Sequence, residues 1–555
     1  MAETESRLRI IPLGGLGEVG KNMMVFDFDG SLLVIDAGLA FPRDEVLGID
    51  LIIPDFTFLR ERADAVEAVL LTHGHEDHVG ALPFLLREMN VPVYGTKLTL
   101  GLVRNKLEEH GLAGAADLRE IKPGKSEEIG PFHCEFIHVT HSIPDGVAVA
   151  VKTPVGTVVH SGDFKLDPNP IDRQRTDLGK FGELGIQGVT LLLSDSTNAE
   201  VGGVTGPEKS VGKTMDEIFT LAPGRIIVAS FASHIHRIQQ IVNASRRHRR
   251  RLAVVGRSMV RNVQIARELG YLDVPEEMLI SLGDIDNFKP RKVVILSSGS
   301  QGEPLSALTR MAYNDHKKVK LQADDTVIIS ARPVPGNELN VHQVINRLFK
   351  AGANVIYEAV APVHVSGHAA REELKMLINL TQPEFFIPIH GEYRHLHFHK
   401  ELAEEMGMDS RRIIMAANGD VIELSGGKVK IVDTIEAGIA YVDGLNVGDI
   451  HDVTLRDRKK LSRDGSIIVV LPVSEQDGSP VAKPEIFTKG FVYMGSRKEL
   501  MKEVSRMVDD IIGEGASHGI TDPGLLQEHI HDRLARFIYR KTKKRPLIIA
   551  VVVEV

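Results

Sequence analysis

Cysteine and long apolar runs are what this sequence has least of. Cys134 is the only cysteine, which excludes an internal disulfide and suits the reducing cytoplasm. No apolar run approaches the roughly 20 residues that cross a bilayer. The polar residues 1–7 lead directly into a strand-like segment, which predicts no secretory signal. We therefore expect a cytoplasmic protein without a membrane partner.

An excess of positive charge is also absent. The net charge is -9, so the chain is not coated in positive charge for nucleic-acid binding. This net charge is compatible with a local basic groove, because binding at a site depends on the local electrostatic potential and not on the net charge. The densest basic run, residues 246–251, is either a solvated helix end or a contact to a phosphate backbone.

The length of the chain predicts several domains. A chain of 555 residues exceeds one ordinary core, and its 43% apolar and 25% charged residues are typical of a soluble globular protein. Strand-like and helix-like segments predict a first domain that is split by an α/β insertion in βαβ order. A connecting stretch and a last domain follow, and the last domain has a strand, two helices and a final β run. The expected bounds are 1–205 and 361–425 for the split domain, 206–360 for the insertion, 426–454 for the connection and 455–555 for the last domain.

The most informative segment is 72–78, with the sequence Thr-His-Gly-His-Glu-Asp-His, which follows the largely apolar run 66–71. Neutral imidazole and carboxylate groups are ligands for Zn²⁺ or Mn²⁺. A polar loop that happens to be rich in histidine is the alternative, but ligand-type residues recur after later strands. The pattern therefore indicates a two-metal hydrolase.

The later residues complete two sets of ligands. A two-metal hydrolytic site needs one ion to activate water, one to hold the substrate oxygen, and a ligand that bridges them. The residue types do not distinguish Zn²⁺ from Mn²⁺. Asp36, at another strand end, is placed to orient the histidines. We expect one ion on His73, His75 and His141, a second on Asp77, His78 and His390, and Asp163 as the bridge.

This set of motifs resembles the metallo-β-lactamase superfamily. It comprises H-x-H-x-D-H at 73–78, the lone His141, S-G-D at 161–163 and I-P-I-H-G at 387–391. The resemblance implies a four-layer αββα sandwich with the metals at one edge of the sheets, but it does not fix one activity. His390 follows Asp163 by 227 residues (390 minus 163). Such a gap resembles the β-CASP nucleases, in which a second domain is inserted.

Within the β-CASP group, the chain resembles the bacterial ribonuclease J family over about residues 8–425 and in its C-terminal extension. The resemblance implies a two-metal phosphodiester hydrolase that acts on single-stranded RNA in the maturation of ribosomal RNA and the decay of messenger RNA. It implies 5′-to-3′ exonuclease and endonuclease activity, with a preference for 5′-monophosphate ends. The segments that carry it are 72–80, 138–145, 231–240, 298–304, 333–338, 364–368 and 387–393.

The resemblance also implies roles for individual residues. The catalytic residues are Asp77, Asp195 and His368, with His368 as the general acid that Asp195 orients. The loop 298–302 is small and rich in hydrogen-bond donors, which suits an anion. We therefore expect this loop, on its own composition, near the terminal 5′-phosphate, and a plain tight turn is the alternative. Substrate contacts are expected from Ser233, His234, Ile235, Ser298, Gly299, Ser300, His364, Val365, Ser366, Gly367 and His368.

The resemblance implies a structural Ca²⁺ site at Gly48, Asp50 and Asp443, because these positions match residues that bind Ca²⁺ in some members of the family. Two surface turns are the alternative there. The family architecture further implies self-association through the last domain, as a homodimer or homotetramer. Other RNA-processing proteins are candidate partners.

Two other classes of function stay open. A thioester or lactone hydrolase of the same fold predicts a shallow site without an inserted domain, which the long gap before His390 contradicts. A degenerate scaffold without activity predicts lost ligands, whereas all seven expected positions hold competent residues.

Overall fold

The computed structural model describes residues 6–42, 46–444, 446–448, 452–476, 479–491, 497–517 and 522–555. The chain forms two compact units, one of Met1–Phe41 and Ile52–Ala440, the other of Pro42–Leu51 and Tyr441–Val555. The segment Pro42–Leu51 thus belongs to the C-terminal unit, although the sequence places it in the first predicted domain. Residues 445 and 449–451 of the predicted connecting stretch lie outside the described residues.

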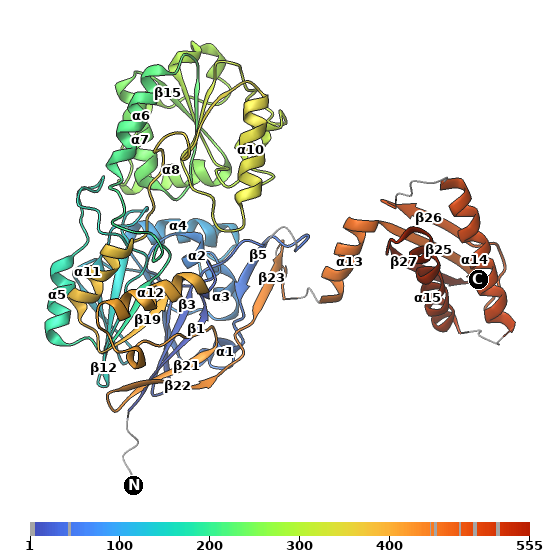
Figure 1. Cartoon of the computed structure of the whole chain (residues 1–555), viewed down its shortest axis with the longest axis horizontal. Coiled ribbons are helices and arrows are strands. Elements are labelled where there is room, and N and C mark those ends of the chain that lie inside the picture. Colours follow the sequence, from blue (N-terminus) through green and yellow to red (C-terminus); the bar gives the residue numbers. More distant parts are fainter. Residues whose placement is uncertain are drawn as a thin grey trace, which may run out of the picture. The chain divides into compact units, whose positions relative to one another are not determined.

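Two sheets face each other in the first unit (Figure 1). The first has the order β22-β21-β1-β3-β4-β6-β7-β8, and the second β19-β13-β12-β11-β10-β9. The first comprises β1 (Leu8–Gly14), β3 (Met23–Phe28), β4 (Ser31–Ile35), β6 (Val66–Leu70), β7 (Val93–Gly95), β8 (Leu118–Glu120), β21 (Asp420–Ser425) and β22 (Lys428–Thr434). The second comprises β9 (Ser126–Ile129), β10 (Phe132–His138), β11 (Val147–Thr153), β12 (Gly156–His160), β13 (Leu191–Asp195) and β19 (Phe385–Ile389). A short parallel pair, β2 (Leu16–Gly17) and β20 (Gly391–Glu392), lies apart from both sheets.

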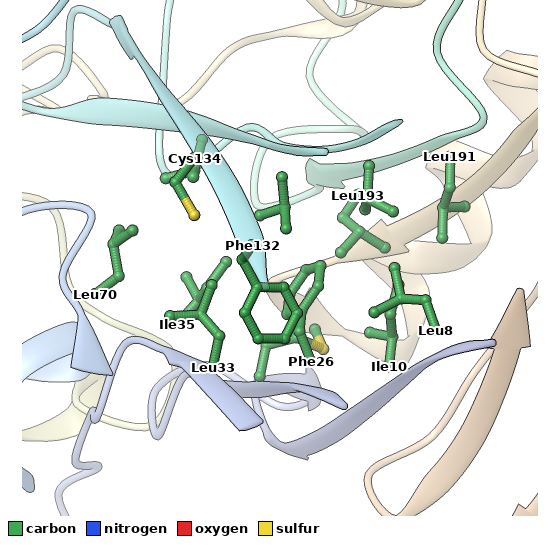
Figure 2. Close-up of a cluster of buried hydrophobic side chains, with 14 of the residues drawn as sticks. Leu8, Ile10, Phe26, Leu33, Ile35, Leu70, Phe132, Cys134, Leu191 and Leu193 are labelled. Carbon is green, nitrogen blue, oxygen red and sulfur yellow. The ribbon is translucent and has the colours of Figure 1, made fainter. Parts of the chain in front are cut away.

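Apolar side chains from both sheets fill the space between them. Alternate residues of a strand point to the same face, so Leu33 and Ile35 of β4 and Phe132 and Cys134 of β10 belong to one buried cluster. Figure 2 shows these side chains, with Phe26 of β3, lying between the two sheets. The two sheets are therefore held together by apolar side chains that occur at alternate positions of the strands in each sheet.

Helices cover the outer faces of the two sheets. On the second sheet, α5 (Leu178–Gln187), α11 (Arg371–Thr381) and α12 (Tyr393–Glu405) pack through Phe181, Leu374 and Leu402. The expected four-layer αββα sandwich is confirmed. Beside the first sheet lie α1 (Thr57–Arg60), α2 (Glu76–Val79), α3 (Leu82–Glu88) and α4 (Lys97–Glu109) (Figure 1).

Parallel strands bring distant residues to one edge of the sandwich. β4 and β6 are parallel neighbours in the first sheet, and β12, β13 and β19 are parallel neighbours in the second. Carboxyl ends of parallel strands lie at the same edge of a sheet. This edge therefore collects the polar residues at and after those strand ends, which are Asp36, His73, Asp163, Asp195 and His390.

The inserted domain lies between β13 and β19 in the sequence and has its own five-stranded parallel sheet, in the order β15-β16-β14-β17-β18. Its strands are β14 (Ile226–Ala229), β15 (Arg251–Val255), β16 (Val293–Ser297), β17 (Thr326–Ile329) and β18 (Asn354–Ile356). Helices α6 (Lys209–Leu221), α7 (Ile235–Arg247) and α8 (Arg257–Leu269) pack on one face. Helices α9 (Ala307–Ala312) and α10 (Glu338–Lys350) pack on the other. The predicted α/β insertion is confirmed (Figure 1).

The C-terminal unit is a small sheet covered by two helices. β25 (Ser466–Val473) lies between β26 (Glu485–Lys489) and the parallel β27 (Leu547–Glu554). Helices α14 (Arg497–Ser517) and α15 (Pro523–Thr542) cover one face with side chains such as Val504 and Ile530. The predicted strand, two helices and final β run are confirmed. The remaining α-helix and strands of the described residues are α13 (Asp452–Asp464) and the short strands β5 (Leu51–Pro54), β23 (Ile439–Asp443) and β24 (Asn446–Val447). In the part of the chain that the structure describes, no helix has the length and apolar character to span a membrane.

Phe132→Ala should destabilise the sandwich. The ring of Phe132 is fully buried between the sheets, and deleting such a ring costs about 3–5 kcal/mol through lost burial and a residual cavity. Chemical denaturation followed by circular dichroism measures the change, with Ile186→Ala, at a side chain that is 90% exposed, as the control. A loss equal to that of the control would contradict this packing.

Candidate metal centre

Nine side chains converge at the shared edge of the sandwich into three overlapping groups, and in each group the ligand atoms lie within 4.8 Å of one another. The first two groups have the membership that the sequence predicts, and Asp163 belongs to both. The first group is His73, His75, His141 and Asp163, and the second is Asp77, His78, Asp163 and His390. The third group is Asp163, Asp195, His368 and His390.

The carboxylate of Asp163 lies between the two groups. Its Oδ2 is 3.2 Å from Nε2 of His78 and 3.4 Å from Nε2 of His390. The same oxygen is 3.6 Å from Nε2 of His73 and 3.8 Å from Nε2 of His141. Ligand atoms around a tetrahedral zinc ion, at about 2.0–2.1 Å from it, are about 3.3 Å apart. The spacing therefore fits a divalent ion in each group with one shared carboxylate oxygen.

Hydrogen bonds from outside the groups orient the imidazoles. Nδ1 of His78 donates to Oδ2 of Asp36 at 2.7 Å, and Nδ1 of His141 donates to the backbone oxygen of Gly367 at 2.8 Å. Thr72 donates to Asp36 with its N–H at 2.8 Å and with its hydroxyl at 2.9 Å. Such contacts fix the orientation of each ring and direct its Nε2 toward the ligand group. Asp36 thus makes the orienting contact that its position predicts.

Asn22 makes the corresponding contact to His390, and the sequence reasoning missed it. Its Oδ1 accepts a hydrogen bond from Nδ1 of His390 at 2.8 Å, and its Nδ2 donates to the backbone oxygen of Asp77 at 3.0 Å. The available signal was the glycine-rich loop before it. A Cβ on Gly15, where φ is +90°, would lie 2.4 Å from Oδ1 of Asn22. The glycine is required there because the backbone passes against the asparagine side chain.

Two residues of the site have a left-handed backbone. The φ angle is 54° at His390 and 63° at Asp36, a region that residues other than glycine rarely adopt. Backbone strain of this kind persists where the surrounding contacts hold the residue, and it is concentrated at functional sites.

Burial and charge divide the imidazoles into two kinds. Burial lowers the pKa of His73 and His141 well below the usual range and that of His75 to about 4, so these rings are neutral and can donate lone pairs. Burial also lowers the pKa of His78 and His390, but the surrounding carboxylates, with Asp163 first among them, together outweigh burial and raise both pKa values above the usual one. The second group therefore carries the stronger interaction with the shared carboxylate.

His368 and Asp195 form a buried pair beside the two groups. Nδ1 of His368 donates to Oδ2 of Asp195 at 2.7 Å. Burial lowers the pKa of His368, but the carboxylate of Asp195 outweighs it and raises this pKa to about 9. The His368 ring centre is 5.0 Å from that of His141 and 5.5 Å from that of His390. A buried imidazole paired with a carboxylate thus lies next to the predicted metal ligands.

One segment of predicted substrate contacts, 364–368, carries His368 itself. Segment 364–368 precedes α11, and a Cβ on Gly367 would lie 2.6 Å from Cε1 of His141, so this loop passes against the ligands. His234 precedes α7 between Ser233 and Ile235, and its buried ring is 6.4 Å from that of His364. The structure therefore brings the 233–235 and 364–368 segments together.

The loop at 298–300 follows β16 at the edge where β14, its parallel neighbour, leads to Ser233. Ser300 is buried. The adjacent Gln301 accepts from the N–H of Val334 at 2.7 Å and donates to the backbone oxygen of Arg332 at 2.9 Å. The loop is thus fixed in place, and its phosphate-binding role stays a prediction.

The basic run 246–251 is largely occupied by contacts within the inserted domain. Arg246 pairs with Asp273 at 3.0 Å and Arg247 with Asp216 at 2.6 Å. The buried Arg250 donates to backbone oxygens just after α6. These contacts favour the helix-end interpretation over a phosphate contact.

The residues predicted to bind calcium gather in the C-terminal unit around an arginine. Nη1 of Arg458 donates to the backbone oxygen of Gly48 at 2.7 Å, and Nη2 donates to Oδ2 of Asp443 at 2.7 Å. Oδ2 of Asp50 accepts from the N–H of Gly444 at 2.8 Å. A guanidinium thus lies on two of the three predicted ligands, and calcium binding there requires Arg458 to move.

Family models match most of the chain. The metallo-β-lactamase superfamily model matches residues 16–195, and a Zn-dependent metallo-hydrolase RNA specificity domain matches 352–414. The β-CASP domain of ribonuclease J matches 223–348, and the ribonuclease J C-terminal domain matches 453–555. With the αββα sandwich and its metal-ligand groups, these matches define a metallo-β-lactamase-fold hydrolase with an inserted β-CASP domain.

Relatives that match nearly the whole chain identify the family within this class of hydrolases. The chain is 44% identical to ribonuclease J2 of Bacillus subtilis over 548 residues, 99% of both chains. It is 44% identical to ribonuclease J of Thermus thermophilus over 560 residues, 99% of this chain and 96% of the relative. The chain belongs to the ribonuclease J family, and the resemblance read from its motifs is confirmed. A crystal structure of a protein of unknown function from Enterococcus faecalis shares the fold, with a TM-score of 0.54 at 15% identity over 75% of this chain and 100% of that one.

Asn22→Ala should weaken metal binding. Removing the acceptor frees the ring of His390 to rotate and to change tautomer, and the loss of such an outer contact costs about 10- to 100-fold in metal affinity. Competition with a metal-binding dye measures the dissociation constant. Asn90→Ala, at an exposed position, is the control. An affinity equal to that of the control would contradict the orienting role of Asn22.

Proposed function

We propose that this chain hydrolyses single-stranded RNA from 5′-monophosphorylated ends in the 5′-to-3′ direction, and that it also cleaves internally. Its family and its RNA specificity domain make it a metal-dependent ribonuclease. The observation that carries the finer proposal is the His368–Asp195 pair, which stands next to two ligand groups that share Asp163.

The two groups would hold two divalent ions, Zn²⁺ or Mn²⁺, with Asp163 between them. When bound, such ions activate water and neutralise charge on the phosphoryl group. The protein's own part is to hold the ligand positions through Asp36, Asn22 and the backbone of Gly367. Asp77 is a ligand with a 30% exposed side chain, so water and phosphate can reach the second group from its side.

His368 supplies the proton that the leaving 3′ oxygen needs. Asp195 accepts a hydrogen bond from Nδ1, and its negative charge raises the pKa of His368, which favours the protonated imidazole. The other ring N–H is then available to the oxygen that departs when the P–O bond breaks. After the transfer, the negative charge of Asp195 favours return of a proton from solvent.

The loops around the acid hold the RNA backbone. Ser366 and the backbone of 364–368 offer hydrogen-bond donors to phosphate oxygens. In the neighbouring 233–235 segment only Ser233 is partly exposed, since His234 and Ile235 are buried. The loop at 298–300, at the edge of the inserted sheet, is the proposed position of the terminal 5′-phosphate. Backbone contacts of this kind position RNA without reading its sequence.

We further propose a cytoplasmic enzyme of RNA maturation and decay that assembles as a homodimer or homotetramer. The C-terminal sheet supports assembly through the face that its helices leave open. Phe487 is 50% exposed there, Val553 40% and Ile549 39%. Exposed apolar side chains gathered on one face mark interaction surfaces.

One RNA, labelled at its 5′ end and bearing either a monophosphate or a triphosphate, tests the activity with purified protein and Mn²⁺. We expect labelled mononucleotide from the monophosphorylated RNA alone and internal fragments from both RNAs. His368→Ala should slow cleavage about 10²- to 10⁴-fold, the range for a general acid. His397→Ala, at a side chain that is 50% exposed on α12, should leave the rate unchanged.

Each part of the proposal has its own contradicting result. Internal fragments without mononucleotide would contradict the 5′-end exonuclease. Equal rates for His368→Ala and His397→Ala would contradict the general acid. No cleavage of either RNA by metal-loaded protein would contradict the ribonuclease and favour a small-molecule hydrolase.

A further inference from the structure

Glu373 is a buried carboxylate that binds three backbone N–H groups. It lies in the first turn of α11 and is 2% exposed. Its Oε1 accepts from the N–H of Leu166 at 2.7 Å, and its Oε2 accepts from the N–H of Thr205 at 2.6 Å and of Ala370 at 2.9 Å. Hydrogen bonds to an ionised acceptor are shorter and stronger than neutral ones.

The three N–H groups come from three separate loops of the site. Leu166 lies three residues after Asp163 (166 minus 163), and Ala370 lies two residues after His368 (370 minus 368). Thr205 lies between β13, which ends at Asp195, and α6 of the inserted domain. One carboxylate thus joins the loops that carry the shared metal ligand, the general acid and the entry into the insertion.

The same loops also hold the backbone of His368 directly. The hydroxyl of Thr205 donates to the backbone oxygen of His368 at 2.7 Å, and Nδ2 of Asn198 donates to the same oxygen at 2.9 Å. Nδ2 of Asn198 also donates to Oγ of Ser366 at 2.8 Å. The backbone around His368 is therefore fixed on both sides of the residue whose ring must meet Asp195.

A helix cap alone does not account for Glu373. Its bond to Ala370 is the ordinary reach of a third helical residue back to the start of the helix. The bonds to Leu166 and Thr205 connect residues 207 and 168 positions away in the sequence. Only an ionised carboxylate offers two acceptor oxygens of this kind, because an amide replaces one of them with a donor that opposes the N–H groups.

We infer that Glu373 is a positioning residue, which holds the loops of His368, Thr205 and Asp163 in the relative positions that proton transfer requires. This inference rests on the proposed function, because it acts through the general acid. A displacement of a reacting group by about 1 Å costs about 10²-fold in rate. Loss of the carboxylate should therefore lower kcat rather than the affinity for RNA.

Glu373→Gln tests this role, with Glu372→Gln as the matched control on the same helix. The side chain of Glu372 is 55% exposed and pairs with Lys375 at 3.0 Å. We expect Glu373→Gln to lower kcat on 5′-monophosphorylated RNA about 10²-fold, with KM and metal content close to those of the control. A kcat equal to that of Glu372→Gln would overturn the inference.

A double-mutant cycle separates positioning of the acid from a general structural effect. If Glu373 acts through His368, Glu373→Gln should change kcat little in the His368→Ala background. An equal fold-loss in both backgrounds would overturn the inference. Where Glu373→Gln does not fold, Glu373→Asp takes its place, because it keeps the carboxylate but shortens the side chain that reaches the N–H groups of Leu166 and Thr205. An unchanged kcat for Glu373→Asp would then overturn the inference.

RNA cleavage by the unmodified protein shows whether a negative result contradicts the role of Glu373 or the proposed function. A metal-loaded parent that leaves RNA intact contradicts the ribonuclease, and this role of Glu373 with it. A parent that cleaves RNA, together with variants that cleave equally well, contradicts the role of Glu373 alone.

Discussion

The buried negative charge of Asp163 is the interaction on which the geometry of the centre depends. One of its oxygens lies within 3.8 Å of nitrogens from four imidazoles. Burial raises the pKa of this carboxyl, but His390 and His78 outweigh it and hold the pKa well below the usual range. A buried charge is stable only when it is paired. The strand ends of both sheets must therefore meet at this carboxylate.

The inserted domain and the His368–Asp195 pair are linked by the path of the chain. Asp195 ends β13 just before the insertion, and His368 follows it, yet their side chains are 2.7 Å apart. The strand after the insertion, β19, returns parallel to β13 and delivers His390 to the same edge. The chain thus leaves the sandwich after Asp195 and re-enters it near His368. The placement of the insertion and the geometry of this pair therefore depend on the same backbone. Glu373 connects to this backbone on both sides of the junction.

The sequence predicts those residues of the candidate site whose own side chains are of a metal-ligand type. The histidines and aspartates at strand ends were identifiable because few structural roles require that many ligand types in one motif, and the apolar strands before them set their common edge. Asn22 and Glu373 were not identifiable, because their partners are a ring and backbone N–H groups from distant segments, which leave no local pattern. The glycine-rich loop before Asn22 is evident in the sequence. The reason for it, which is the close approach of Gly15 to the side chain of Asn22, is evident only in the folded protein. The contacts of Arg458 with Gly48 and Asp443, at the predicted calcium site, were not identifiable for the same reason, since nothing in the sequence places these residues together.

The metal content of the purified protein tests the central claim most directly. Inductively coupled plasma mass spectrometry after dialysis against Zn²⁺ or Mn²⁺ counts the ions per chain for the parent and for Asp163→Ala, with Asp433→Ala at an exposed position as the control. A shared carboxylate predicts two ions in the parent and in the control, and a loss from both positions in Asp163→Ala. One ion in the parent, or two retained by Asp163→Ala, would contradict a centre built on this residue.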